Sequence, residues 1–105
     1  MRHWVKRQIV WTEEAQASVA VMQQVGFDLA AGNARAALQA YATTGQCPDN
    51  EVNYFDRGAW RGWWRLKESG VWNGWRVLFQ DRPNRRLIVV KRVRLRPDAY
   101  NDPPA

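Results

Sequence analysis

The chain has 105 residues, which is enough for one domain with a modest core. Its composition, 46% hydrophobic and 25% charged, excludes a disordered chain, and no apolar run approaches the roughly 18 residues of a membrane span. The formal net charge of +6 indicates a polyanionic partner.

The first half of the chain predicts one strand followed by two helices. Residues 5–11 alternate apolar and polar side chains, which is typical of a half-buried strand. Thr12 precedes two glutamates and predicts a helix N-cap, after which apolar residues recur at helical spacing for about three turns. Gly26 ends this helix, and a second, alanine-rich helix is predicted from about Asp28. Residues 43–50 are turn formers and predict a loop.

The second half predicts three strands. Residues 60–67 and 75–80 alternate, and the pair Asn73-Gly74 between them is a strong signal for a hairpin turn. The last strand, 87–94, begins with a nearly continuous apolar run, which is typical of a central strand.

These elements predict an α+β fold made by a single domain over residues 1–105. We expect an N-terminal strand, a helical hairpin and a three-stranded antiparallel meander, with the helices packed on one face of the sheet. A short tail from about residue 101 is expected to fray. Residues 57–96 hold twelve of the sixteen Lys and Arg residues but only two acids, a net charge of +10, so the bases should gather on the other face of the sheet or its rim.

The usual catalytic and targeting signatures are absent from the sequence. The only histidine, His3, lies near one end, so a catalytic triad is not expected. No His/Cys cluster has metal-ligand spacing and no Gly-rich phosphate loop is present, so we expect no metal and no cofactor. Cys47 is the only cysteine in the sequence, which excludes an internal disulfide. We interpret it as a bystander rather than a reactive thiol. Residues 1–7 do not have the pattern of a signal peptide, which makes the cytoplasm the expected location.

The candidate site is a group of bases with aromatic residues between them. Guanidinium groups bind phosphates in bidentate fashion, and exposed rings stack on unpaired bases. RNA cleavage needs an acceptor for the 2′-hydroxyl proton, a cation for the phosphorane and a donor for the leaving oxygen. The alternatives are bases that serve only solubility, and core positions for Trp63 and Trp72. The group comprises Arg61, Trp63, Arg65, Lys67, Trp72, Arg76, Arg92, Arg94, Arg96 and Tyr100.

About residues 60–100 resemble the RelE/ParE superfamily of bacterial toxins. The family's central hairpin is similar to the run Trp64-Arg65-Leu66-Lys67, a short turn, and Gly74-Trp75-Arg76-Val77-Leu78-Phe79. Its last strand and terminal Arg-x-x-x-Tyr are similar to the stretch Leu87–Tyr100, although Leu95 stands where many relatives have a histidine.

The resemblance implies a toxin of a type II toxin–antitoxin system in the bacterial cytoplasm. Its RelE-like branch implies a ribosome-dependent mRNA endoribonuclease, or mRNA interferase, that inhibits translation. The implied partners are a cognate antitoxin protein, the ribosome and mRNA, with no membrane and no metal. Two alternatives stay open: a non-enzymatic ParE-like inhibitor of DNA gyrase, and an inactive nucleic-acid-binding relative.

The resemblance also implies roles for individual residues. Lys67 is the predicted general base, because the arginine two positions before it stays protonated. Arg76 is predicted to bind the scissile phosphate. A further arginine after the last strand corresponds to Arg94 or, in the other register, Arg96. Tyr100 is predicted to stack on an mRNA base or to assist proton transfer.

Overall fold

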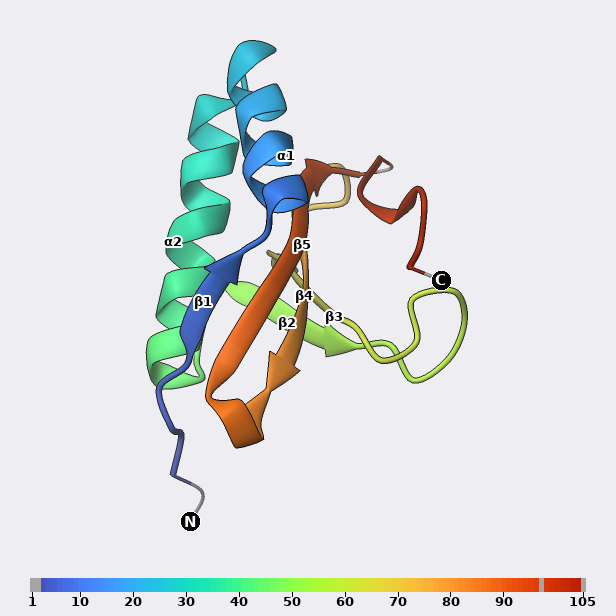
Figure 1. Cartoon of the computed structure of the whole chain (residues 1–105). Helices are drawn as coiled ribbons and strands as arrows, with labels where there is room; N and C mark the ends of the chain where they lie inside the picture. Colours follow the sequence, from blue (N-terminus) through green and yellow to red (C-terminus); the bar gives the residue numbers. More distant parts are fainter. Residues whose placement is uncertain (1–2, 97, 105) are drawn as a thin grey trace.

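The structure is a computed structural model that describes residues 3–96 and 98–104. Two helices and five strands follow one another along the chain, with two short 3-10 helices, η1 and η2, near its end (Figure 1). Their bounds are β1 Gln8–Trp11, α1 Glu13–Gln24, α2 Asp28–Thr44, β2 Asn50–Tyr54, β3 Trp64–Glu68, β4 Trp75–Arg82, η1 Pro83–Arg85, β5 Leu87–Leu95 and η2 Asp98–Tyr100. None of the helices in these described ranges has the length and apolar character needed to cross a bilayer.

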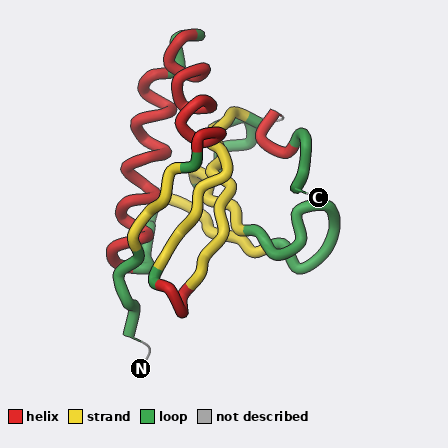
Figure 2. Tube along the Cα trace, viewed as in Figure 1, coloured by secondary structure: helices red, strands yellow, loops and turns green. Residues whose placement is uncertain are grey.

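The five strands form one mixed sheet in the order β1-β5-β4-β3-β2. Strand β1 runs parallel to β5, and the other neighbours are antiparallel. Both long helices lie on one side of this sheet, while η2 and the loop between β2 and β3 lie on the other (Figure 2). The predicted α+β fold with helices on one face is confirmed, but the antiparallel part has four strands rather than three.

The additional strand is β2, which runs along the edge of the sheet beside β3. Its start falls at the end of the segment predicted as a loop, and its sequence is mostly polar, as suits an edge strand with one solvated face. Strand β3 begins later than predicted, at Trp64. Gly58 and Gly62 have φ angles of +85° and +89°, so the chain before β3 turns where a strand was expected.

Helix α1 begins at its predicted cap. The Thr12 hydroxyl oxygen accepts the backbone N–H of Ala15 at 3.1 Å, and the hydroxyl donates to the carbonyl of Val90 at 2.7 Å. The same side chain therefore caps the helix and ties it to β5. Gly26, with φ +90°, ends the helix as expected.

Helix α2 ends at Gly45, whose φ of +74° gives a left-handed C-cap. A Cβ atom at this position would lie 2.5 Å from the ring of Trp4, so only glycine fits. The Trp4 indole donates to the carbonyl of Ala42 at 3.0 Å, which fastens the N-terminal segment across the end of the helix.

The main core lies between the helices and strands β3, β4 and β5. It takes alternate residues of β4, as a sheet with one covered face requires, and in β5 this alternation is broken once, between Val90 and Val93. The strand residues in it are Leu66, Trp75, Val77, Phe79, Ile88, Val90 and Val93. At the register shift between Leu78 and Phe79, Lys91 of β5 has no partner in β4. This extra residue lets Val90 and Val93 face the same side of the sheet. A second, smaller cluster of Trp60, Leu78 and Ala99 lies on the other face, where η2 and the β2–β3 loop meet the sheet.

Candidate nucleic-acid interface

Strand register brings five of the predicted site residues onto the sheet face opposite the helices. Lys67 pairs with Arg76, and Arg76 pairs with Arg94, so one row of cations crosses β3, β4 and β5. Arg65 lies two residues before Lys67 in β3, and Arg92 lies two residues before Arg94 in β5, so both point to the same side as the row. We call these five residues the basic face.

Strand β2 adds two polar partners that the sequence reasoning missed. Asn53 is paired with Arg65 in register, and its side-chain oxygen accepts from the Arg65 Nη2 at 2.7 Å. Glu51 is paired with Lys67, whose Nζ donates to the Glu51 Oε2 at 3.3 Å. The only signal in the sequence was the alternation of these two residues around Val52, which points toward the helices.

The Glu51 carboxylate lies next to Lys67 with its side chain 44% exposed. The hydrogen bond and the positive charge of Lys67 hold the pKa of Glu51 below its usual range. Glu51 is therefore ionised at neutral pH. An exposed carboxylate on a cationic face repels phosphate but can accept a proton, so Lys67 and Glu51 form a pair suited to proton transfer.

Arg76 is buried, with 1% of its surface exposed. Its Nη2 donates to the carbonyl of Trp72 at 2.8 Å, and its Nη1 donates to the carbonyls of Trp75 at 3.0 Å and Gly74 at 3.2 Å. Among the described residues, its Nε has no partner. The Arg76 side chain thus holds the β3–β4 turn together by binding backbone carbonyls of that turn. Its positive charge lies beneath the surface of the basic face.

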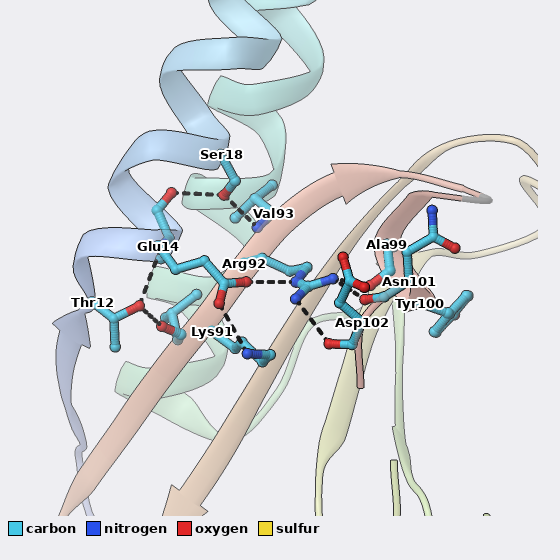
Figure 3. Close-up of polar contacts among 12 residues, drawn as sticks. Thr12, Glu14, Ser18, Lys91, Arg92, Val93, Ala99, Tyr100, Asn101 and Asp102 are labelled. Atoms are coloured by element: carbon cyan, nitrogen blue, oxygen red, sulfur yellow. Dashed lines mark hydrogen bonds and ion pairs between the residues drawn. The ribbon is translucent and has the colours of Figure 1, made fainter. Parts of the chain in front are cut away.

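Arg92 is also buried, with 4% of its surface exposed, and it binds two segments of the chain (Figure 3). Its Nε donates to Glu14 of α1 at 2.7 Å. Its terminal nitrogens donate to the carbonyl of Asn101 and, at 3.3 Å, to that of Asp102. Arg92 therefore anchors the segment after η2, including the start of the tail expected to fray, and leaves little surface to RNA.

The Glu14 carboxylate bridges Arg92 and Lys91, whose Nζ donates to it at 2.9 Å (Figure 3). Partial burial acts to raise the pKa of Glu14, but the hydrogen bonds and charges of the two bases outweigh it. The pKa of Glu14 is therefore lowered. Sequence reasoning assigned this residue only to the first turn of a helix, because its partners lie more than seventy positions away.

Tyr100 stands on the rim of the basic face. Its hydroxyl accepts from Arg65 Nη1 at 3.3 Å, and its backbone carbonyl accepts from the indole of Trp60 at 3.1 Å. Phe55 meets the Tyr100 ring edge-on at 6.2 Å, and Trp63 meets the Trp60 ring edge-on at 5.9 Å. Tyr100 and Trp63 are thus held beside Arg65 by an aromatic cluster that includes the buried Trp60.

Trp72 and Arg96 form a second aromatic element at the β3–β4 turn. Trp72 is 67% exposed, and the Arg96 guanidinium lies 3.9 Å from the centre of its ring. Such a stacked pair offers a flat, cationic platform to an unpaired base. Arg61 is exposed in the β2–β3 loop, and Arg94 is half-buried at the end of β5. The predicted site residues thus divide into an accessible set and the two buried arginines Arg76 and Arg92.

Cys47 lies outside the basic face, partly buried against the helical core. Burial raises the pKa of its thiol, which disfavours the reactive thiolate. Within the part of the chain that the structure describes, no group of three His, Cys, Asp or Glu side chains could hold a metal ion.

Fold and site together define a small α+β protein of the RelE-like fold, with a cationic sheet face rimmed by aromatic residues. No protein-family model matches the chain, and neither does any curated protein. Among solved structures, the chain is similar to the crystal structure of YafQ from E. coli strain BL21(DE3). The TM-score is 0.67 at 12% sequence identity, and the match covers 91% of this chain and 100% of that chain. At this identity the likeness establishes the fold.

Proposed function

We propose that this protein is the toxin of a type II toxin–antitoxin system and acts as a ribosome-dependent mRNA endoribonuclease. The observation that carries the proposal is the row of Lys67, Arg76 and Arg94 across the sheet face opposite the helices. The RelE-like fold, which this chain has in common with YafQ, supports it. The bacterial cytoplasm is the compartment in which such a toxin meets its target.

The proposed reaction is a transesterification within the RNA backbone. The 2′-oxygen attacks phosphorus as its proton passes to Lys67, which gives up one of its own protons to the hydrogen-bonded Glu51 carboxylate, or as it passes to Glu51 directly. The phosphorane gains negative charge, which Arg94 and the buried charge of Arg76 stabilise. The bond to the 5′-oxygen then breaks, leaving a 2′,3′-cyclic phosphate, and the Tyr100 hydroxyl supplies a proton to the departing oxygen.

The residues around this centre would hold the message. Arg61 and Arg65 offer guanidinium groups to phosphates, and Trp63 with the stacked pair Trp72 and Arg96 offers ring faces to bases. Contacts of this kind release counterions, so affinity should fall steeply as salt rises.

The proposed antitoxin is an acidic chain that covers the basic face or the helical hairpin with a strand or a helix. On the basic face, its carboxylates would replace the phosphates of RNA at the same cations. Cleavage and neutralisation would then be mutually exclusive.

Primer extension on a defined mRNA, with and without programmed ribosomes, tests the proposal. We expect new 3′ ends only when ribosomes are present. Arg57→Gln is a suitable control, because this arginine is 92% exposed in the β2–β3 loop and pairs only weakly with Asp56 at 3.7 Å. Intact message in both reactions, from protein shown to be folded, would contradict the proposal.

A non-enzymatic inhibitor of DNA gyrase, or an inactive nucleic-acid-binding relative, is the second candidate. One observation favours it: Lys67, Arg76 and Arg92 are all engaged by partners within the protein. A gyrase supercoiling assay separates these hypotheses. Inhibition that survives Lys67→Met would support docking to gyrase, and harmless expression without an antitoxin would support the inactive relative.

A further inference from the structure

A second group of bases gathers at the turn between β4 and β5, and none of them belongs to the basic face. Lys6, Arg82, Arg85 and Arg86 are all exposed. Arg82 and Arg85 line one hollow, and Lys6, Arg85 and Arg86 line another, so the two hollows share Arg85. We call these four residues the turn patch. Figure 1 shows η1, which carries Arg85, at the end of the sheet remote from the C-terminal segment.

The turn patch keeps its positive charge unneutralised. The nearest acid in sequence, Asp81, accepts from the buried Arg7 at 2.9 Å, and both side chains are nearly enclosed. Arg82 donates only to the neutral side chain of Gln80, at 3.0 Å. Among the residues that the structure describes, no ion pair includes a member of the turn patch. Four neighbouring cations without a counter-charge repel one another and attract an anion.

The backbone conformation of Arg86 also supports an anion site at the turn patch. This residue has φ +55° and ψ +45° and closes η1 through a hydrogen bond from its N–H to the Pro83 carbonyl at 3.0 Å. Glycine or asparagine adopts this left-handed conformation at lower cost than arginine. The chain thus accepts an unfavourable backbone conformation while placing a guanidinium at this position.

We propose that the turn patch is a second RNA-binding site, which holds the phosphates of a folded RNA while the basic face holds the message. Arg82 lies six positions after Arg76 along β4, a distance of roughly 20 Å at about 3.3 Å per residue. One phosphate cannot reach both surfaces, so an RNA that occupies both at once must be large. Three of the four bases are arginines, whose planar group matches phosphate oxygens. The choice of RNA rests on the proposed function.

The test compares two double variants with the same loss of charge. Arg85→Gln/Arg86→Asn removes two cations of the patch and places at position 86 a residue that tolerates its backbone. Arg35→Gln/Arg57→Gln removes two exposed cations elsewhere. The probe is a fluorescein-labelled RNA hairpin, and its anisotropy is followed at several salt concentrations.

We expect the patch variant to bind at least about tenfold more weakly, with a salt slope smaller by about two, because each phosphate that is no longer neutralised lowers the slope by roughly one. The control variant should bind within about threefold of the parent. Lys6→Gln/Arg82→Gln, which leaves η1 untouched, should repeat the loss if the first variant is unstable. Equal losses in patch and control variants would overturn the proposal.

Two further outcomes are decisive. Unchanged hairpin binding by both patch variants, together with abolished binding to an acidic peptide or to phosphatidylserine vesicles, would overturn RNA as the occupant. Primer extension with the parent protein reads the proposed function separately. Absent cleavage with patch-dependent hairpin binding would refute the endoribonuclease and support the patch, whereas normal cleavage without patch-dependent binding would do the reverse.

Discussion

Arg76 joins the β3–β4 turn together through three backbone carbonyls while its charge lies under the basic face. We expect Arg76→Ala to lower the free energy of unfolding by about 1–3 kcal/mol, because buried carbonyls lose their donor. Cleavage should fall at least ~10²-fold, as expected when a charge that stabilises the transition state is removed. Urea denaturation and primer extension measure the two effects. A folded Arg76→Ala protein that cleaves at the parent rate would remove Arg76 from the site.

Lys67 can be separated into its two roles, cation and proton acceptor. Lys67→Arg keeps a positive charge but introduces a guanidinium that stays protonated. We expect RNA affinity within about threefold of the parent and cleavage at least ~10²-fold slower, a loss typical of general base removal. Glu51→Gln is the matched variant, because Glu51 is the hydrogen-bond partner of Lys67. Normal cleavage by Lys67→Arg with none by Glu51→Gln would transfer the role to Glu51.

Much of the candidate site could be predicted from single residues and the two-residue period of strands. That period places Lys67, Arg76 and Arg94 on one face, and the structure brings them into one row. It says nothing of what each side chain meets. The burial of Arg76 and Arg92 depends on backbone carbonyls of a turn and of the C-terminal segment, which only the folded chain positions.

The elements whose apolar residues recur at regular helical or strand spacing were predicted from the sequence. Strand β2, whose apolar pattern is weak, was not predicted. Helix α1 shows its Thr12 cap and apolar spacing, and β5 shows its apolar run. Strand β2 has one inward apolar residue, Val52, among polar neighbours, so its existence depends on pairing with β3. Strand β3 begins later than its alternating pattern predicts. Gly58 and Gly62 adopt positive φ angles, and these angles turn the chain before Trp64.

The C-terminal segment is held in place by helix α1, which predicts an effect of Glu14 on η2. Glu14→Gln removes the charge that binds Arg92, so the segment carrying Tyr100 should open more often. With Glu14 40% exposed, solvent screening limits the loss to about 1 kcal/mol, or roughly fivefold faster hydrogen exchange at the Trp60 indole, which donates to this segment. Glu13→Gln is the control. Unchanged exchange in the Glu14 variant would contradict the anchor.

The same anchor should weaken in acid. The pKa of Glu14 in the folded protein lies below its ordinary value of 4.5. A carboxyl with a depressed pKa contributes its full stability above the ordinary value and loses it as the pH falls through the folded value. Exchange at the Trp60 indole should therefore show an extra acceleration below about pH 4.5 in the parent protein. The Glu14→Gln protein should lack this acceleration, and its presence there would assign it to another carboxyl.

At the scale of the whole molecule, the excess positive charge lies on the strand side of the fold and not on the helical side. The helices cover one face of the sheet (Figure 1), while the basic face lies on the strands and the turn patch lies at the β4–β5 turn and on the segment before β1. Residues 57–96, whose net charge is +10, contain β3, β4 and β5. The helical half of the chain carries most of the acids. A polyanion is therefore attracted to the strand side and directed away from the helices.

This polarity predicts that RNA stabilises the fold by binding it. A ligand at about one hundred times its Kd contributes about 2.7 kcal/mol, and each kcal/mol raises the Tm of a domain this small by roughly 4–8 °C. We expect a single-stranded RNA oligonucleotide to raise the Tm by about 10 °C or more at low salt. The shift should shrink by at least about half in Lys67→Met/Arg94→Gln, because these cations lie in the same row. Polyglutamate is the control for charge alone. An equal shift with polyglutamate would mean that the strand side binds any polyanion, whereas a larger shift with RNA would show that ring stacking at Trp72 and Tyr100 adds to the charge.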